Sequence, residues 1–413
     1  MLNRVVKYQI KSSALGYAIS FLLLIGLICS GVLFISSANK RLEMNYLLND
    51  HMLLNNYLGL KYGARSNSIG QETLVHTSGD TSSILIKNWG AFRVVVSRTK
   101  HKTRFVERSA IVGYSIDQNR PALYLPNQRN VLKLCGASKL EGTVYLSDRG
   151  LERGNISGKP FQGEKLLLGE KKKSDKNLPS INSEILNFEF KNLIKKGVRI
   201  ELPQTDTVFS FTNQTRFINE TESISIHSSI KGNCIIHSFD SIFVSSKAAL
   251  ENVILIAPIV FFESSFKGSV QVIAEKRVTC QSEVFLKYPS TIVLIEKSSD
   301  GNKENGIFLE ENSKVIGGVL LMSESPNFRK PIQLRIEKAI VGGLVYNQGE
   351  TELNGKIIGS IYTSKFTLNT GSGQYSNYLL DATISSKQLP SGFIAPVWLK
   401  EEVKQQAKII ICF

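Results

Sequence analysis

The sequence predicts a mainly β protein that begins with a membrane-spanning helix, and three features of the chain point to this fold. Residues 14–36 are apolar and uncharged, residues 83–120 are rich in β-branched and aromatic residues, and residues 123–395 alternate short apolar runs with glycine and polar residues. We expect a transmembrane α-helix at 14–36 with a helical extension at 37–62, a small antiparallel β region at 83–120 and a β-solenoid at 123–395. A C-terminal cap would follow at 396–413.

The apolar segment from Ala14 to Ile35 contains 22 residues without a charge. At about 1.5 Å per residue, a helix of this length crosses a hydrocarbon core of roughly 30 Å. Lipid offers no partner for backbone N–H and C=O groups, so a spanning segment must be helical. The residues that we expect to form this anchor are Ala14, Leu15, Phe21, Leu24, Ile28, Leu33 and Ile35.

The charges on either side of the span predict its orientation. Arg4, Lys7 and Lys11 precede it without an acidic residue among them, whereas Glu43 and Asp50 follow it. The positive-inside rule therefore places residues 1–13 in the cytoplasm. We expect a single-pass protein of the inner (cytoplasmic) membrane whose ectodomain is periplasmic or extracellular. The alternative is a cleaved signal peptide, because Ser36-Ser37-Ala38 offers small residues for a cut after Ala38.

Beyond the span, the chain continues with helix-forming residues as far as Leu60. Apolar residues recur there at three- to four-residue intervals or multiples of them, which predicts one packed stripe, and Gly63 offers a natural stop. The stripe residues are Leu42, Tyr46, Leu53 and Tyr57.

Three segments in the β region have strand composition: Ile84–Ile86, Phe92–Val96 and Phe105–Tyr114. A polar turn at Lys100–Thr103 would join the last two. The region is also basic. We favour the solvated face of an antiparallel sheet as the reason, and the alternative is a contact patch for phosphate or anionic glycan.

A short unit recurs along the solenoid region. It consists of an apolar residue, any one residue, a glycine, any one residue and then apolar residues. Leu140-Glu141-Gly142-Thr143-Val144 is its first occurrence. Each coil of a right-handed β-helix-like solenoid needs such a tight corner followed by a short strand. The alternative fold is a β-sandwich. The expected corners are Gly142, Gly232, Asn252, Gly268, Gly317, Gly342 and Gly355.

Two further segments flank or interrupt these coils. Lys171–Lys176 is a charge run without an apolar pattern, which favours an exposed loop. Val397–Lys408 could form a short helix that covers the last coil, because an open solenoid end invites strand pairing.

The motif search yields no catalytic constellation. Cys234 and His237 are three residues apart, but no second ligand pair follows, so we expect no metal. We also expect no cofactor and no enzymatic activity. The alternative is a membrane-tethered glycan-active β-helix enzyme, which would need carboxylates gathered on one solenoid face. Four cysteines outside the span could form disulfides or be buried thiols: Cys135, Cys234, Cys280 and Cys412.

The charge balance narrows the expected partners. Lys and Arg exceed Asp and Glu by 15, and the pI is near 9.4. An exported basic protein can meet membrane lipid or anionic glycan, and nothing beyond charge indicates nucleic acid.

The N-terminal segment resembles the type IV pilin-like and pseudopilin families, whose members carry a basic leader, a glycine before the cleavage point and a long apolar helix. Lys7 and Lys11 match the leader, and Gly16-Tyr17 matches the cleavage point. Phe21 stands where the family has a glutamate that aids subunit registration. The glycine-cornered units resemble bactofilin-like solenoids and uncharacterised envelope proteins of the Bacteroidetes type. These resemblances imply a structural or assembly component of a pilus-like or secretion-like surface apparatus that contacts other envelope or pilus-like subunits.

Overall fold

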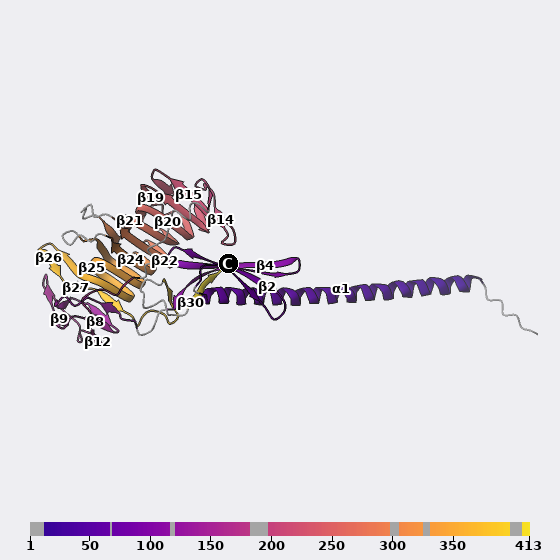
Figure 1. Cartoon of the computed structure of the whole chain (residues 1–413), viewed down its shortest axis with the longest axis horizontal. Coiled ribbons are helices and arrows are strands. Elements are labelled where there is room, and N and C mark those ends of the chain that lie inside the picture. Colours follow the sequence, from indigo (N-terminus) through magenta and orange to yellow (C-terminus); the bar gives the residue numbers. More distant parts are fainter. Residues whose placement is uncertain are drawn as a thin grey trace, which may run out of the picture.

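The computed structural model of the chain describes residues 12–66, 68–115, 120–181, 197–297, 305–324, 331–396 and 407–413. Within these ranges the molecule has three parts in a row. A long helix, α1, projects from one end, a solenoid of parallel strands forms the other end, and an antiparallel sheet lies between them (Figure 1). The predicted combination of one N-terminal apolar helix, an antiparallel β region and a β-solenoid is confirmed.

The helix α1 runs without a break over Ser12–Arg65. It is longer than the predicted 14–62, because Gly63 does not end it. Gly63 is followed by Ala64 and Arg65, and the basic side chain of Arg65 in the last turn favours the negative end of the helix dipole.

The antiparallel sheet, here called sheet A, contains the predicted β region and two short strands from the C-terminal end of the chain. Its strand order is β1-β2-β3-β4-β29, and β30 also pairs with β4. The turn between β3 and β4 is tight, and Lys102 adopts φ 52° there. The strands of sheet A are β1 (Gly70–Val75), β2 (Thr81–Trp89), β3 (Phe92–His101), β4 (Arg104–Ser115), β29 (Ile394–Ala395) and β30 (Ala407–Cys412).

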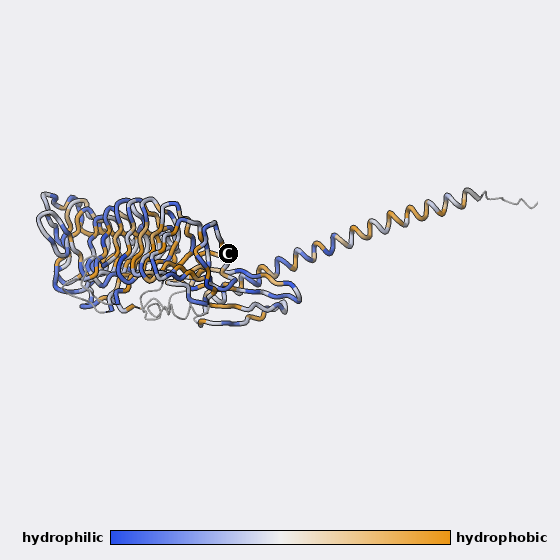
Figure 2. The backbone as a smooth tube through the Cα atoms, turned by 90° about the horizontal axis from the view of Figure 1, so that it is seen from above, coloured by the Kyte–Doolittle hydropathy of each residue, from blue (hydrophilic) through white to orange (hydrophobic). Residues whose placement is uncertain are grey.

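The solenoid is built from coils whose strands pair in parallel with the equivalent strands of the next coil. Residues 235–237 pair with 254–256, and 254–256 pair with 271–273. Repeated parallel pairing of this kind rules out the alternative β-sandwich, whose sheets are antiparallel. Buried aliphatic side chains such as Ile236, Leu255 and Val272 form the core of the solenoid. Full burial of each such side chain stabilises the fold by about 1.5–3 kcal/mol. Figure 2 shows its coils stacked side by side, with hydrophobic stretches along the backbone of each coil.

The strands of the solenoid vary widely in length. The principal ring holds β5 (Leu123–Tyr124), β7 (Lys139–Glu141), β8 (Val144–Leu146), β12 (Lys171–Lys173), β13 (Val198–Arg199), β14 (Thr207–Phe209), β15 (Arg216–Glu220), β16 (Ile224–Ile226), β17 (Ser229–Gly232), β18 (Cys234–Ser238), β19 (Ser241–Val244), β20 (Ala249–Phe262), β21 (Lys267–Cys280), β22 (Phe285–Glu296), β23 (Gly306–Leu309), β24 (Lys314–Ser323), β25 (Gln333–Thr370), β26 (Gly373–Ser376) and β28 (Thr383–Ser385). Smaller groups are β6 (Leu132–Cys135), β9 (Leu151–Arg153) and β27 (Tyr378–Leu380), and the pair β10 (Asn155–Ile156) and β11 (Lys159–Pro160).

The coils are not stacked in the order of the sequence. The first strand, β5, lies between β25 and β8, and β7 lies beside β28. From β5 the chain runs to β12 at one end of the stack, and β13 begins at the opposite end. It then returns coil by coil to β25 and β28. The chain therefore enters and leaves the solenoid within the stack, close to its β12 end.

Several coil corners adopt the left-handed backbone that glycine and asparagine tolerate. Gly142, Gly232, Asn252 and Gly317 have positive φ. Gly268, Gly342 and Gly355 do not, and positive φ occurs instead at Gly343 and Gly359. Gly317, Gly343 and Gly359 lie above one another in successive coils, where a Cβ would collide with the carbonyl oxygen of the coil beneath. Close approach between coils is thus a second reason for glycine at these corners.

The prediction of an exposed loop at Lys171–Lys176 is wrong for its first three residues. Lys171–Lys173 is not a loop but the strand β12, which pairs with β8 and exposes all three lysines. Lysines on an end strand discourage pairing with another chain. The expected helix over 397–408 lies mostly outside the described residues, but its last residues belong to strand β30. That strand extends sheet A rather than covering a coil.

Candidate assembly element

The amino-terminal part of α1, Ala14–Asp50, exposes an apolar surface along its whole length. Leu15, Phe21 and Leu33 are 62%, 66% and 70% exposed. The other predicted anchor residues, Ala14, Leu24, Ile28 and Ile35, are exposed as well. The segment is long and apolar enough to cross a membrane, a test that a signal sequence near an N-terminus also meets. A surface of this size needs lipid or protein to cover it.

The residues of the two expected cleavage points lie inside this helix. Gly16 accepts a hydrogen bond at its carbonyl oxygen from Ser20 Oγ, 2.9 Å away, and Tyr17 is 78% exposed. Ala38 is partly covered. A cut after Gly16 would leave nearly all of α1 intact, whereas a cut after Ala38 would divide it.

The carboxyl-terminal part of α1, His51–Arg65, packs on sheet A. Asn55 is buried there, and four further buried side chains are spaced by four residues: Met52, Asn56, Leu60 and Ala64. The predicted stripe is wrong for this face, since Leu42, Tyr46 and Tyr57 are 53%, 70% and 41% exposed and Leu53 is only partly covered. Small residues decide which face packs, because they allow close approach of the helix to the strands.

Two glycines show how close that approach is. A Cβ on Gly63 would lie 2.6 Å from Val95 Cγ1 and 2.7 Å from Ile84 Cγ2. A Cβ on Gly59 would collide with Ser97 Oγ. Heavy atoms in contact are normally about 3.5–4.0 Å apart, so both positions exclude any larger residue without a shift of the helix.

Hydrogen bonds from the neighbouring Asn55 and Asn56 hold the helix on the sheet. Asn56 Nδ2 donates to the carbonyl oxygens of Ser97 (2.6 Å) and Val106 (3.1 Å), and thus joins β3 and β4. Asn55 Nδ2 donates to Asp80 Oδ2 at 2.8 Å. Hydrogen bonds to buried groups cannot be exchanged for water, so these contacts specify one position of α1.

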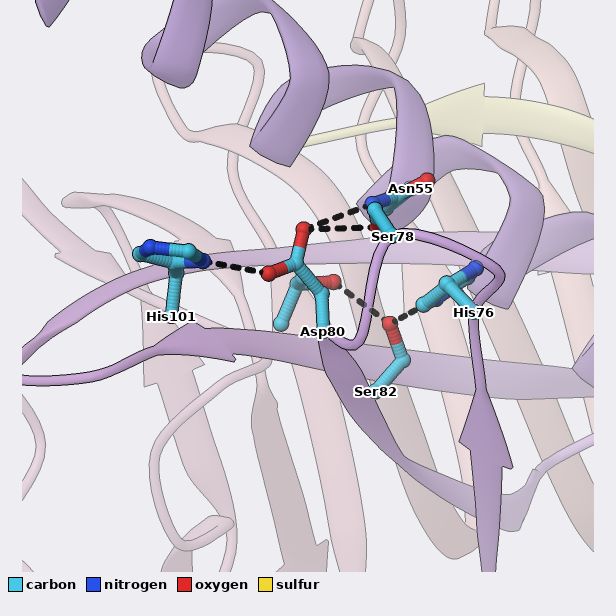
Figure 3. A network of polar contacts seen from close by, with 7 residues as sticks. Asn55, His76, Ser78, Asp80, Ser82 and His101 are labelled. Atoms are coloured by element: carbon cyan, nitrogen blue, oxygen red, sulfur yellow. Dashed lines mark hydrogen bonds and ion pairs between the residues drawn. The ribbon is translucent and has the colours of Figure 1, made fainter.

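Asp80 is the centre of a polar network at the base of the helix (Figure 3). His101 Nδ1 lies 2.6 Å from Asp80 Oδ1, and Ser78 Oγ donates to Oδ2 at 3.2 Å. Burial raises the pKa of the Asp80 carboxyl, but the hydrogen bonds from His101, Asn55 and Ser78 outweigh it. The pKa of Asp80 therefore lies below its ordinary value, and the carboxylate stays charged at neutral pH.

The serine and histidine in the same network are structural. His76 Nε2 lies 2.7 Å from Ser82 Oγ, and Ser82 Oγ lies 2.6 Å from Thr99 Oγ1. Burial lowers the pKa of His76, and the charge of Asp80 opposes this only in part. Ser82 is fully buried beneath α1, so its hydroxyl cannot reach a substrate. The distance between Ser82 and His76 is that of a nucleophile and its general base, but substrate has no access to the serine.

A glutamine of the solenoid fixes the other side of sheet A. Gln271 Oε1 accepts from the backbone N–H of Ala91 at 2.7 Å, and its Nε2 donates to the carbonyl oxygen of Trp89 at 3.0 Å. Both groups belong to the β2–β3 turn, where Gly90 has φ 60°. Around this contact, Trp89, Phe92, Val94 and Ile111 pack against Phe217, Ile235 and Ile254 of the solenoid. Helix, sheet and solenoid are thereby joined in one body.

The outward side of the later coils is covered by the segment after β12. Tyr124 stacks between Tyr145 and Tyr362, with ring centroids 5.5 and 5.7 Å apart. Tyr124 and Tyr346 donate from their hydroxyls to the carbonyl oxygens of Asn177 and Pro179. This face of the solenoid is therefore closed by its own chain.

A cavity of about 260 Å³ on the solenoid holds two carboxylates. Glu296 accepts from Asn305 Nδ2 at 3.0 Å and from Ser323 Oγ at 2.8 Å. Glu350 forms an ion pair with Lys365 at 2.8 Å. Both carboxylates thus already have partners in the wall that they line.

Other candidate residues are not brought together. Among the described residues, no group of three or more His, Cys, Asp or Glu side chains could hold a metal. Cys135, Cys234 and Cys280 are buried free thiols, and Cys29 and Cys412 are exposed free thiols. Sequence reasoning missed Asn55, Asn56, Asp80 and Gln271, although the pair of asparagines in an apolar helical segment was a usable signal.

Comparisons with known proteins add little to this geometry. No protein-family model and no curated protein matches the chain. Among solved structures, the crystal structure of the competence-associated pilin ComZ from Thermus thermophilus is similar at 10% sequence identity. The alignment covers 90% of this chain and 95% of that one, with a TM-score of 0.24. A score this low carries no argument about function, which must come from the residues themselves.

Proposed function

We propose that this chain is a non-enzymatic, membrane-anchored subunit of a pilus-like or secretion-like surface apparatus. The observation that supports the proposal is the division of α1 into a packed and an exposed part. Sheet A and the solenoid, together called the β head, pack only against His51–Arg65 of the helix. The apolar helical surface from Ala14 onward is left for lipid or for other copies. A helix that is fixed at one end and free at the other is suited to anchoring first and helix–helix packing afterwards.

The proposal includes a location. The amino-terminal part of α1 would cross the inner membrane once, with residues 1–13 in the cytoplasm and the β head outside. Packing between copies would use the apolar face, including Phe21, where the pilin families have a charged glutamate. Contacts there would therefore be made by shape and dispersion rather than by an ion pair.

Cross-linking in native membranes tests this function. The natural Cys29 already lies exposed on the span and can be tested in a Cys412→Ser background, and cysteines placed singly from Leu22 to Leu33 in a Cys29→Ser/Cys412→Ser background extend the scan. We expect dimers that recur with a period of about 3.6 residues, which marks one helix face. A cysteine at Ser372, on a solenoid turn far from α1, is the matched control. Recovery of the chain as an isolated soluble species, with no cross-links on the span, would sink the proposal.

The non-enzymatic part of the proposal rests on the partners that the carboxylates of the solenoid cavity already have. Glu296 is bound by two neutral donors, and Glu350 by Lys365. Glycan cleavage needs an acid and a base free to exchange protons with substrate. Incubation of the full chain with neutral and acidic polysaccharides should leave their chain lengths unchanged. Shortening that disappears in Glu296→Gln would favour the glycan-active alternative.

A further inference from the structure

The end of the β3–β4 hairpin carries a concentration of positive charge. Glu107 is the single acidic residue between positions 98 and 108. The Arg98 guanidinium lies 4.2 Å from the ring centroid of Phe105, which is 55% exposed. Five lysine and arginine side chains of the hairpin are exposed, and none of them forms an ion pair within the described part of the chain. These exposed side chains are Arg98, Lys100, Lys102, Arg104 and Arg108.

The hairpin points along α1 toward its amino-terminal part. Gly63 of the helix faces Val95, and Gly59 faces Ser97, which is nearer the turn. Asn55 then contacts Asp80, the partner of His101 at the end of β3. Helix numbers fall as β3 approaches its turn, and Figure 1 shows the hairpin projecting beside α1 away from the solenoid. The basic tip therefore lies at the end of sheet A that faces the proposed membrane surface, beside the β1–β2 turn.

The length of the uncharged helix makes a tilt in the bilayer favourable. The apolar part, Ala14–Ile35, is about 33 Å of helix, but no charge occurs between Lys11 and Lys40, so as many as 28 residues, or about 42 Å, can enter a hydrocarbon core of about 30 Å when the helix tilts. A span longer than the core is accommodated by tilting, commonly by about 20° and up to about 40°. Length alone does not choose the direction of this tilt.

Tilt toward the hairpin brings its cations to the lipid headgroups. Asn55 lies about 24 Å along the helix from Asn39, and a layer packed on a helix lies about 10 Å from its axis. At a tilt of about 40° the tip is then about 12 Å above the hydrocarbon edge. The headgroup layer accounts for about 6 Å of this distance. Extended lysine and arginine side chains can cover most of the rest.

We propose that the β3–β4 hairpin binds anionic lipid headgroups and so determines the direction in which α1 tilts before the subunit assembles. The inference rests on the proposed function, because it needs α1 to span a bilayer. Lipid phosphates suit a cluster of lysine and arginine side chains on a mobile surface, where contacts are many and individually weak. Lys87 on β2 and Arg93 on β3 lie farther from the tip and are not required.

The test uses the full chain in lipid nanodiscs. A fluorophore is placed at Thr103→Cys in a Cys29→Ser/Cys412→Ser background, in which the remaining cysteines are buried. Discs contain either phosphatidylcholine alone or equal parts of phosphatidylcholine and phosphatidylglycerol, with a nitroxide quencher on some headgroups. We expect quenching at least about twofold stronger in the anionic discs, and its loss at high salt, because the Debye length shortens to about 3 Å at 1 M.

Matched charge variants separate the hairpin from net charge. Lys100→Glu/Lys102→Glu/Arg104→Glu should abolish the difference between the discs. Lys171→Glu/Lys172→Glu/Lys173→Glu makes the same change at a far end of the solenoid and should preserve it. Equal quenching in both discs overturns the inference, as does a salt-insensitive signal. So does capture of the hairpin by soluble polyphosphate without any response to anionic discs. Failure of the chain to enter either disc would instead count against the proposed function.

Discussion

The two parts of α1 belong to one continuous helix but meet opposite demands. The carboxyl-terminal part presents small residues and paired asparagines to sheet A, and its position is specified by contacts such as those of Gly63 and Asn56. The amino-terminal part presents large aliphatic side chains in all directions, and no side chain from Ala14 to Asp50 is buried. The length of the helix therefore comes from local propensity, whereas the size and polarity of its surface residues determine what packs against each part.

Charges in the amino-terminal part should give the largest effect. In Leu23→Asp/Leu27→Asp, each carboxylate opposes membrane insertion by about 2.5–3.5 kcal/mol, so the chain should leave the membrane fraction. The melting temperature of the head should not change. The matched control is Leu58→Asp, an exposed position of the carboxyl-terminal part, which should stay in the membrane. Equal membrane recovery of the double variant would contradict the proposed division.

Enlarging a glycine should do the reverse: it should destabilise the protein in the carboxyl-terminal part of α1 and have no effect in the amino-terminal part. Gly63→Val places new methyl groups against Val95 and Ile84, and overpacking of this kind costs about 1–3 kcal/mol of unfolding free energy. Gly26→Val is the control, because no atom lies within 4 Å of its Cβ position. Chemical denaturation of the head should separate the two variants. If both variants unfold at the same denaturant concentration, α1 is not packed on sheet A as described.

The Asp80 network should make attachment of the helix sensitive to acid. The folded pKa of Asp80 is lowered from 3.8, so its contribution is present above that value and is lost as the pH falls through the folded pKa. Asp80→Asn should lower the unfolding free energy by about 1–3 kcal/mol at neutral pH, because a charged hydrogen-bond acceptor is removed. Thermal melts from pH 7 to pH 3 would measure this. An identical pH dependence in wild type and variant would show that Asp80 does not contribute.

Removal of the partly buried charge of Lys87 should give the smallest effect, and it should raise the unfolding free energy rather than lower it. Burial on strand β2 lowers the pKa of Lys87 to about 8. Below pH 8 the folded state holds this charge at a disadvantage, and stability rises as the pH goes from 8 toward 10.5, where the unfolded state still binds the proton. Lys87→Met should stabilise the head by about 1 kcal/mol at pH 7 and flatten this rise. Hydrogen exchange of the β2 amides would detect the gain, and faster exchange in the variant would contradict it.

Much of the fold could be predicted from local patterns. The uncharged run after Lys11 predicts the helix, and alternating β-branched residues predict β2, β3 and β4. Glycine-cornered units such as the one around Gly142 predict a solenoid. Each of these features depends on residues that are neighbours in the sequence, so the signal survives without knowledge of the tertiary structure.

The order of the coils and the packed face of α1 could not be predicted in the same way. β5 stacks on β25, more than two hundred residues later, and no local pattern encodes that pairing. On α1, the apolar stripe through Tyr46 and Tyr57 competes with the small-residue stripe through Gly59 and Gly63. Only the surface of sheet A decides between them. Gln271 likewise looks like an ordinary polar strand residue until the Gly90 turn is placed beside it.

The proposed function requires that α1 remains whole, because only an intact helix can connect a membrane to sheet A and the solenoid. Sequencing the N-terminus of the protein purified from membranes tests it most directly. We expect a chain that begins at Met1, or at Tyr17 after pilin-like processing, since both keep the helix from the span to Arg65. A mature chain that begins at Asn39 would contradict it.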